Sequence, residues 1–186
     1  ATELINRVKG GGALPMFTSC CPAWVKFAEH YYPELIPNLS TCKSPQEMFS
    51  AVLKTYYCMK EGIKPEDLYV VSVIPCTAKK FEATRDELGY YTDAALTTRE
   101  LAKMIREAGL DFANLPESQF DDPFGEASGG GAIFGATGGV MEAALRVAAR
   151  TLGDADEPIV FDEVRGTKGI KEATYTLGGV TVNVAV

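Results

Sequence analysis

The stretch YVVSVIPCTAKKFE, residues 69–82, decides the fold class of the chain. Its first six residues, 69–74, are an apolar run rich in β-branched side chains, which is typical of a strand covered on both faces. A second short strand is expected at Ala94–Leu96, and helical patterns surround both segments. This alternation predicts an α/β fold in which helices pack on a mainly parallel sheet.

Apolar patterns predict the elements on either side of this stretch. Residues 13–18 are expected to form a short buried strand. Residues 22–31 predict a helix, because apolar side chains recur at helical spacing from Trp24, which is expected in the core. A helix rich in small residues is expected at 138–152. The remaining strands are expected at residues 160–165, 173–177 and 180–186, the last two joined by a tight turn.

Two segments are typical of helix starts. Ser44 suits a helix cap, Pro45 suits the first helical position, and Glu47 can close a capping box. Thr97 and Glu100 form a second such pair. The helix that begins after Ser44 is expected to bury an apolar face that carries Met48, Val52 and Met59.

Composition narrows the class of protein. The net charge of −7 argues against binding to nucleic acid or to an anionic membrane surface. No run approaches the ~18 apolar residues that a membrane span needs. The N-terminal residues lack the apolar core of a secretory signal. We therefore expect a cytoplasmic protein with no nucleic-acid partner and no membrane span.

The cysteines and the single histidine limit the possible chemistry. An odd number of scattered cysteines without a C-x-x-C pair indicates neither a disulfide framework nor a zinc ribbon. His30 alone cannot supply histidine-based zinc sites or hydrolase triads, so thiolates, carboxylates, lysines or a cofactor must act. The five cysteines are Cys20, Cys21, Cys42, Cys58 and Cys76, of which Cys42 and Cys58 are expected to be packing residues.

Two thiols stand side by side in the segment TSCCPAW, residues 18–24. Pro22 fits the first helical position, which places Cys21 at or next to the cap. The positive end of a helix favours the thiolate form, which is the form that binds metal. Cys20 lies one residue earlier on extended chain and points in a different direction. One thiol can therefore be a metal ligand while the other faces a different space.

A third thiol, Cys76, follows the expected strand at 69–74. Open α/β sheets bind ligands at the carboxyl ends of their strands. Lys79, three residues later, could offset the charge of an anionic cofactor and donate a hydrogen bond to it. Lys80 is expected to be a surface charge.

A glycine-rich segment, SGGGAIFGATGG, spans residues 128–139. It is not a phosphate-binding loop, because no Gly-Lys-Ser/Thr follows and Phe134 stands where G-x-G-x-x-G needs glycine. We expect the glycines to let the backbone approach a bulky cofactor, with Phe134 as an apolar wall.

Together, TSCCPAW, IPCTAKKFE and GAIFGATGGVMEAALR resemble the catalytic domain of iron-only (di-iron) hydrogenases, and the likeness extends over residues 3–186. The resemblance implies a two-lobed domain, with residues 1–110 in the first lobe and 111–186 forming a loop and part of the second. It implies a 4Fe-4S cluster linked to a di-iron centre with carbon monoxide, cyanide and dithiolate ligands. It also implies reversible interconversion of H2 with protons and electrons.

The resemblance further implies partners and residue roles. Electrons would pass to ferredoxin or to further iron–sulfur domains, and maturation proteins would build the cluster. Cys21 and Cys76 would be metal ligands, Cys20 the proton-donating thiol, and Lys79 the donor to a cyanide. The proton path would use Glu3, Ser40 and Glu82 in some combination, with Glu3 favoured for the relay and Glu82 for a supporting place near Cys76. The pocket would be lined by Pro45, Gln46, Phe134 and Ile74.

Two departures from the family pattern keep alternatives open. Ile74 stands where the family usually has methionine, and the motif that carries the last two cluster cysteines is absent. We therefore expect a hydrogenase fragment that is inactive in isolation. The first alternative is a non-catalytic relative in iron–sulfur assembly or H2 sensing, although Cys20 favours catalysis. The second is an unrelated α/β binding module with structural cysteines.

Overall fold

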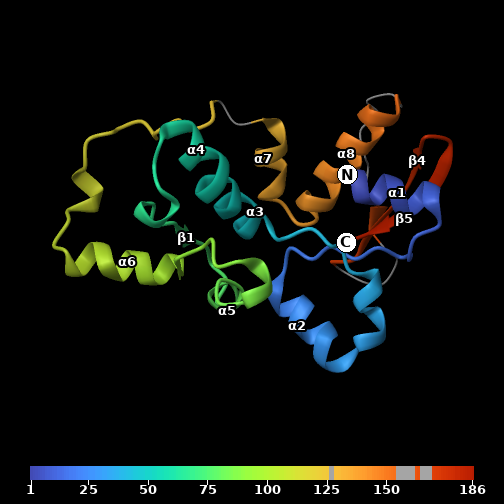
Figure 1. The fold of residues 1–186 in the computed structure, drawn as a ribbon, viewed down its shortest axis with the longest axis horizontal. Coiled ribbons are helices and arrows are strands. Elements are labelled where there is room, and N and C mark those ends of the chain that lie inside the picture. The colour runs from blue at the N-terminus through green and yellow to red at the C-terminus, as the bar shows by residue number, and fades with distance from the viewer. Residues whose placement is uncertain (126–127, 154–161, 164–168) are drawn as a thin grey trace. The chain divides into compact units, whose positions relative to one another are not determined.

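The computed structural model describes residues 1–125, 128–153, 162–163 and 169–186 (Figure 1). The chain divides into two compact units. Unit 1 comprises Ala1–Thr18, Pro37–Ser40 and Glu126–Val186, and unit 2 comprises Ser19–Ile36 and Thr41–Gly125. The assignment of residues 1–110 and 111–186 to lobes of a larger domain stays a prediction. In the described part of the chain, no helix combines the length and the apolar character that a membrane crossing needs.

Unit 1 combines helices with an antiparallel sheet of order β3-β4-β5. Its elements are α1 (Thr2–Gly10), α7 (Gly129–Phe134), α8 (Gly139–Leu152), β3 (Asp162–Glu163), β4 (Lys171–Leu177) and β5 (Val180–Ala185). The predicted tight turn between β4 and β5 is confirmed, with positive φ at Gly178 (56°) and Gly179 (80°). Such a turn matches the twist of a hairpin. Of the strand predicted at 160–165, only β3 lies within the described residues.

An apolar core holds unit 1 together. Leu145, Ala148 and Ala149 of α8 pack with Ala173 and Leu177 of β4. Figure 1 shows α8 beside α1 and the β4–β5 hairpin, and residues of all these elements contact the core. The small residues on α8 let the sheet and α1 approach it closely.

Residues 129–134, within the glycine-rich segment 128–139, form helix α7. Backbone hydrogen bonds such as Gly131 N to Ser128 O (3.0 Å) close its turns, so the glycines are accommodated within local helical bonding. Gly139 permits the close approach of α7 to α8, because a Cβ there would lie 1.9 Å from the carbonyl oxygen of Ile133.

Unit 2 contains most of the helices and a parallel strand pair. Its helices are α2 (Pro22–Tyr31), α3 (Pro45–Val52), α4 (Cys58–Glu61), α5 (Ala78–Glu82) and α6 (Thr98–Glu107), and its strands are β1 (Val71–Val73) and β2 (Ala94–Leu96). A π-helical turn, Leu53–Tyr57, joins α3 to α4. Short 3-10 turns lie at Pro33–Asn38, Pro65–Asp67, Asp86–Leu88 and Phe112–Asn114.

Strands β1 and β2 pair in parallel, with Val71 opposite Ala94 and Val73 opposite Leu96. This confirms the predicted class of mixed helices and sheets with parallel strands. The burial of β1 was predicted wrongly, because Val71 and Val73 are 45% and 46% exposed. Within the described residues, β1 pairs with one strand along one edge, and strand pairing does not cover the faces of a strand.

The strand predicted at residues 13–18 is not formed. Phe17 makes only an isolated parallel bridge with Leu39. Pro15 and Pro37 stand two residues before the bridge on the two segments, and proline has no N–H for a ladder. The pairing therefore cannot extend from the bridge toward the N-terminal side of either segment.

The helix start at Ser44 is confirmed, since its side chain accepts a hydrogen bond from the Glu47 backbone N–H. The predicted burial of the helix was wrong. The apolar side chains expected inside are 41–73% exposed: Met48, Val52 and Met59. The buried face instead carries Glu47, Ser50 and Cys58, because polar partners from elsewhere in unit 2 cover it.

Three smaller expectations have mixed outcomes. Trp24 is only half-buried and packs against Phe27, with ring centroids 6.3 Å apart, so it is not a core residue. Cys58 is buried as predicted, but Cys42 is exposed and presents its carbonyl oxygen to the Ser19 hydroxyl at 2.6 Å. The capping box of Thr97 and Glu100 is confirmed in full.

Candidate active site

The cap of helix α2 places the paired thiols. Cys21 is the N-cap residue, Pro22 follows in the first turn, and the Cys21 sulfur accepts a hydrogen bond from the Trp24 backbone N–H at 3.5 Å. Cys21 is exposed and Cys20 is half-buried, and both are free thiols. The predicted placement of Cys21 at the start of the helix is therefore confirmed.

The strand–helix segment after β1 places the third thiol. Ile74 continues the parallel pairing by donating its N–H to Leu96 O at 2.9 Å. Cys76 follows beyond the carboxyl end of β1 and is half-buried, and its backbone carbonyl oxygen accepts a hydrogen bond from the Lys79 backbone N–H at 3.2 Å. This is the strand end at which the sequence predicted a ligand.

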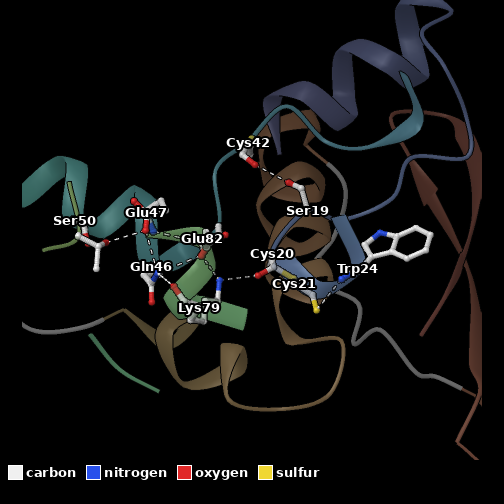
Figure 2. Close-up of polar contacts among 12 residues, drawn as sticks. Ser19, Cys20, Cys21, Trp24, Cys42, Gln46, Glu47, Ser50, Lys79 and Glu82 are labelled. Carbon is white, nitrogen blue, oxygen red and sulfur yellow. Dashed lines mark hydrogen bonds and ion pairs between the residues drawn. The ribbon is translucent and has the colours of Figure 1, made fainter. Parts of the chain in front are cut away.

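A buried lysine joins the two cysteine segments. Lys79 Nζ donates a hydrogen bond of 2.9 Å to the backbone carbonyl of Cys20, 59 residues away in the sequence. Figure 2 shows this contact beside the Cys20–Cys21 segment. The Lys79 side chain is 7% exposed. The segments TSCCPAW and IPCTAKKFE, which the sequence related only by resemblance, therefore contact each other in unit 2.

Glu82 is the centre of a polar network around this lysine. Its Oε2 atom accepts hydrogen bonds from Lys79 Nζ at 2.7 Å, Ser44 Oγ at 2.8 Å and Gln46 Nε2 at 3.3 Å. Gln46 Nε2 also contacts the Lys79 carbonyl oxygen at 3.3 Å. The network ties the start of α3 to α5 and brings together three predicted site residues, Gln46, Lys79 and Glu82.

The network continues to residues that the sequence interpretation missed. Glu47 is 1% exposed, and its Oε1 accepts from Gln46 Nε2 at 3.0 Å and from Thr92 Oγ1 at 2.9 Å. Thr92 also lies 2.7 Å from the Ser50 hydroxyl. Within the described residues, Gln46 Oε1 and Glu47 Oε2 are buried without a hydrogen-bond partner. Glu47 reads in the sequence as a capping residue, so no local signal marked it as buried.

A second predicted pair forms in unit 1. Ser40 Oγ donates to Glu3 Oε2 at 2.7 Å, and Arg7 Nη2 lies 2.7 Å from Glu3 Oε1. Arg7 also donates to backbone carbonyls, including Leu39 O at 2.7 Å. The structure thus brings Glu3 and Ser40 together. The sequence interpretation missed Arg7, although its spacing of four residues from Glu3 suits a helical ion pair.

The other predicted pocket residues have less distinctive surroundings. Pro45 occupies the first turn of α3 and is half-buried. Phe134 ends α7 and is 42% exposed. Their roles as pocket walls stay predictions.

The donor chemistry fits part of an iron–sulfur ligand set. Thiolates are the ligands that such clusters prefer, and a cubane takes about four of them. In the portion of the chain that the structure describes, no three side chains among His, Cys, Asp and Glu gather as a metal site. Cys21 and Cys76 could therefore supply two ligands of a larger set.

Comparison with known proteins finds one family over the whole chain. The family model described as "Iron only hydrogenase large subunit, C-terminal domain" matches residues 1–186. Iron hydrogenase 1 of Clostridium pasteurianum is 53% identical over 100% of this chain and 33% of its own length. The periplasmic [Fe] hydrogenase large subunit of Nitratidesulfovibrio vulgaris is 52% identical over 100% of this chain and 46% of its own.

Comparison with solved structures also finds hydrogenases. A variant of [FeFe]-hydrogenase HydA1 from Chlamydomonas reinhardtii matches with a TM-score of 0.77 and 45% identity, covering 95% of this chain and 45% of that one. Less similar relatives include a cytosolic Fe-S cluster assembly factor of Xenopus tropicalis, 33% identical over 97% of this chain. The chain spans a third to less than half of the length of the first relatives. Because one of them is named periplasmic, the cytoplasmic location stays a prediction.

Proposed function

Because the chain belongs to the family of iron-only hydrogenase large subunits, we propose that it forms part of a catalytic domain that reversibly interconverts H2 with protons and electrons. Family membership removes the interpretation as an unrelated binding module. The observation that supports the proposal most is the contact between Lys79 Nζ and Cys20 O, which joins the two cysteine motifs.

We assign the cofactor contacts to this chain as follows. Cys21 and Cys76 would hold a 4Fe-4S cluster linked to a di-iron centre that carries carbon monoxide, cyanide and dithiolate ligands. When bound, this group would supply the redox chemistry of H2. Lys79 would donate a hydrogen bond to a cyanide, since its buried ammonium favours an anionic neighbour. Pro45, Gln46, Phe134 and Ile74 would line the pocket and exclude water.

Proton movement falls to side chains of this chain. The Cys20 thiol would exchange protons at the reacting end of the path. The Ser40 hydroxyl, at 2.7 Å from Glu3 Oε2, has the hydrogen-bond distance that proton transfer to the carboxylate requires. Glu3 is preferred for the relay, and Glu82 for a supporting role, because Glu82 Oε2 already accepts three donors.

The partners follow from the same proposal. Electrons would pass to ferredoxin or to additional iron–sulfur domains, and maturation proteins would insert the cofactor. A cytoplasmic location remains part of this proposal.

One alternative has a specific observation in its favour. Ile74 replaces the usual methionine, and assembly factors share 33% identity with the chain, so a non-catalytic assembly or sensing role is the second candidate. Cys20 favours catalysis, because a proton-donating thiol serves turnover rather than assembly.

Infrared spectroscopy separates the two candidates. The complete hydrogenase that contains this chain is matured with its accessory proteins, and iron content, infrared spectra and H2 evolution are measured together. Carbonyl and cyanide bands accompanied by H2 evolution are expected for the hydrogenase. Iron without those bands, and without H2 evolution, would favour the assembly role.

A further inference from the structure

We propose that Glu82 is a positioning residue, which holds the Lys79 ammonium against the Cys20 backbone and sets the direction of its remaining N–H donor. The inference rests on the proposed function, because that donor would serve the cofactor. It assigns Glu82 a role through Lys79 rather than a place in the proton path.

Three donors from two helices converge on one oxygen of Glu82. Lys79 and Glu82 lie three residues apart on α5, and their side chains are 7% and 5% exposed. Ser44 and Gln46 reach the same Oε2 atom from the start of α3. Figure 2 shows the Lys79, Glu82 and Gln46 side chains turned toward one another. The carboxylate is therefore held from several directions and cannot rotate without losing hydrogen bonds.

The geometry also accounts for the donors of Lys79. An ammonium has three N–H groups. In the described part of the chain, Lys79 Nζ donates to Glu82 Oε2 and to Cys20 O, which leaves one N–H for another acceptor. Because two acceptors fix the ammonium, the direction of the third N–H is fixed as well. One of the two fixed acceptors is the Cys20 carbonyl oxygen, so the third N–H is oriented beside the segment that carries Cys20 and Cys21.

Charge gives the second argument. A buried ammonium is unfavourable unless an opposite charge and hydrogen bonds compensate it. Glu82 is the carboxylate that contacts Lys79, and its Oε2 accepts three hydrogen bonds around that ion pair. Loss of the negative charge would leave Lys79 buried without compensation, and its position would change.

A double-variant cycle in the matured protein tests the inference. In Glu82→Gln, we expect iron content to be retained, cyanide bands to shift, and H2 turnover to fall about 10–100-fold, as is usual for residues that orient a metal-site contact. In a Lys79→Met background, Glu82→Gln should cause no further change, because Glu82 acts through Lys79. Glu100→Gln is the matched control, because it removes an exposed carboxylate whose ion pair with Lys80 is also 2.7 Å.

The outcomes are distinct. Unshifted cyanide bands and full turnover in Glu82→Gln would overturn the inference, and so would an equal loss in the Lys79→Met background. If Glu82→Gln does not fold, Ser44→Ala removes one donor without leaving an unpaired charge, and unshifted cyanide bands in that variant would overturn the inference. An unmodified protein without carbonyl and cyanide bands would instead refute the proposed function.

Discussion

Unit 1 and unit 2 bury different kinds of side chain. The buried cluster of unit 1 is apolar and consists of Leu145, Ala148, Ala149, Ala173 and Leu177. Unit 2 buries, beside a few apolar residues, a polar set that consists of Ser44, Glu47, Ser50, Lys79, Glu82 and Thr92. A unit held mainly by apolar burial contrasts with one whose interior is a hydrogen-bonded network.

The difference indicates where the chemistry lies. A fully buried leucine contributes about 1.5–3 kcal/mol through the hydrophobic effect. A buried ion pair such as Lys79–Glu82 rarely stabilises the fold more than apolar side chains in the same place would, because both charges lose their hydration. Apolar burial therefore accounts for the interior of unit 1, whereas the buried charged groups of unit 2 are weak contributors to stability and favour a functional role.

The largest expected effect comes from Cys21→Ser in unit 2. A hydroxyl is a poor ligand for an iron–sulfur cluster, so iron per protein should fall to near background and H2 evolution should disappear. Iron analysis of the matured protein measures this. The control is Cys42→Ser, which removes an exposed thiol outside the motifs. Normal iron content in Cys21→Ser would remove its ligand role.

Cys20→Ser should separate proton transfer from metal binding. We expect iron content and infrared bands to persist while turnover falls about 10²–10⁴-fold, which is the usual contribution of a positioned acid or base. H2 evolution assays and infrared spectra measure the two properties on one sample. Turnover equal to that of the unmodified protein would contradict a relay through Cys20.

The next effect belongs to the apolar interior of unit 1. Leu145 is 1% exposed, so Leu145→Ala should lower the free energy of unfolding by about 2–5 kcal/mol. Val147 is 52% exposed on the same helix, and Val147→Ala should change stability by less than about 0.5 kcal/mol. Chemical denaturation measures both. Similar losses for the two variants would mean that the apolar cluster does not control the stability of unit 1.

Local signals explain how much of the fold could be predicted. The helix starts at Ser44 and Thr97 depend on residues within three positions, and both are present. The β4–β5 hairpin depends on two glycines at its turn. Which face of α3 is buried depends on Thr92, which lies 45 residues from Glu47 in the sequence. The local apolar pattern therefore predicted the wrong buried face. Distant partners decide burial, and short motifs do not contain them.

The candidate site shows the same limit. The chemical groups could be predicted because Cys20, Cys21, Cys76 and Lys79 lie in short motifs. The convergence of Ser44 on Glu82 joins residues 38 positions apart, and no local pattern indicates it. The sequence therefore predicted which groups would act but not the network that holds them.

The smallest expected effect concerns Glu100, whose ion pair with Lys80 is the exposed counterpart of Lys79–Glu82. The pKa of Glu100 is lowered from 4.5 to about 2, first by the hydrogen bond from Lys80 and then by those from Thr97. A lowered pKa means that the carboxylate stabilises the fold above about pH 4.5, and that this contribution is lost as the pH falls toward 2.

Glu100→Gln keeps an acceptor for the capping box but removes the charge. Because exposed ion pairs contribute little, we expect the Tm to fall by only about 1–3 °C at pH 7. The difference should shrink between pH 4.5 and 2, and thermal melts of both proteins across this range measure it. Glu107→Gln, which breaks a looser exposed pair with Lys103 at 3.6 Å, is the control for removing an exposed carboxylate away from the helix cap. A Tm difference that stays constant to pH 2 would show that the cap geometry, rather than the charge, is what Glu100 contributes. In that case the contrast between a buried ion pair that serves the site and an exposed pair that stabilises a helix would lose its electrostatic basis.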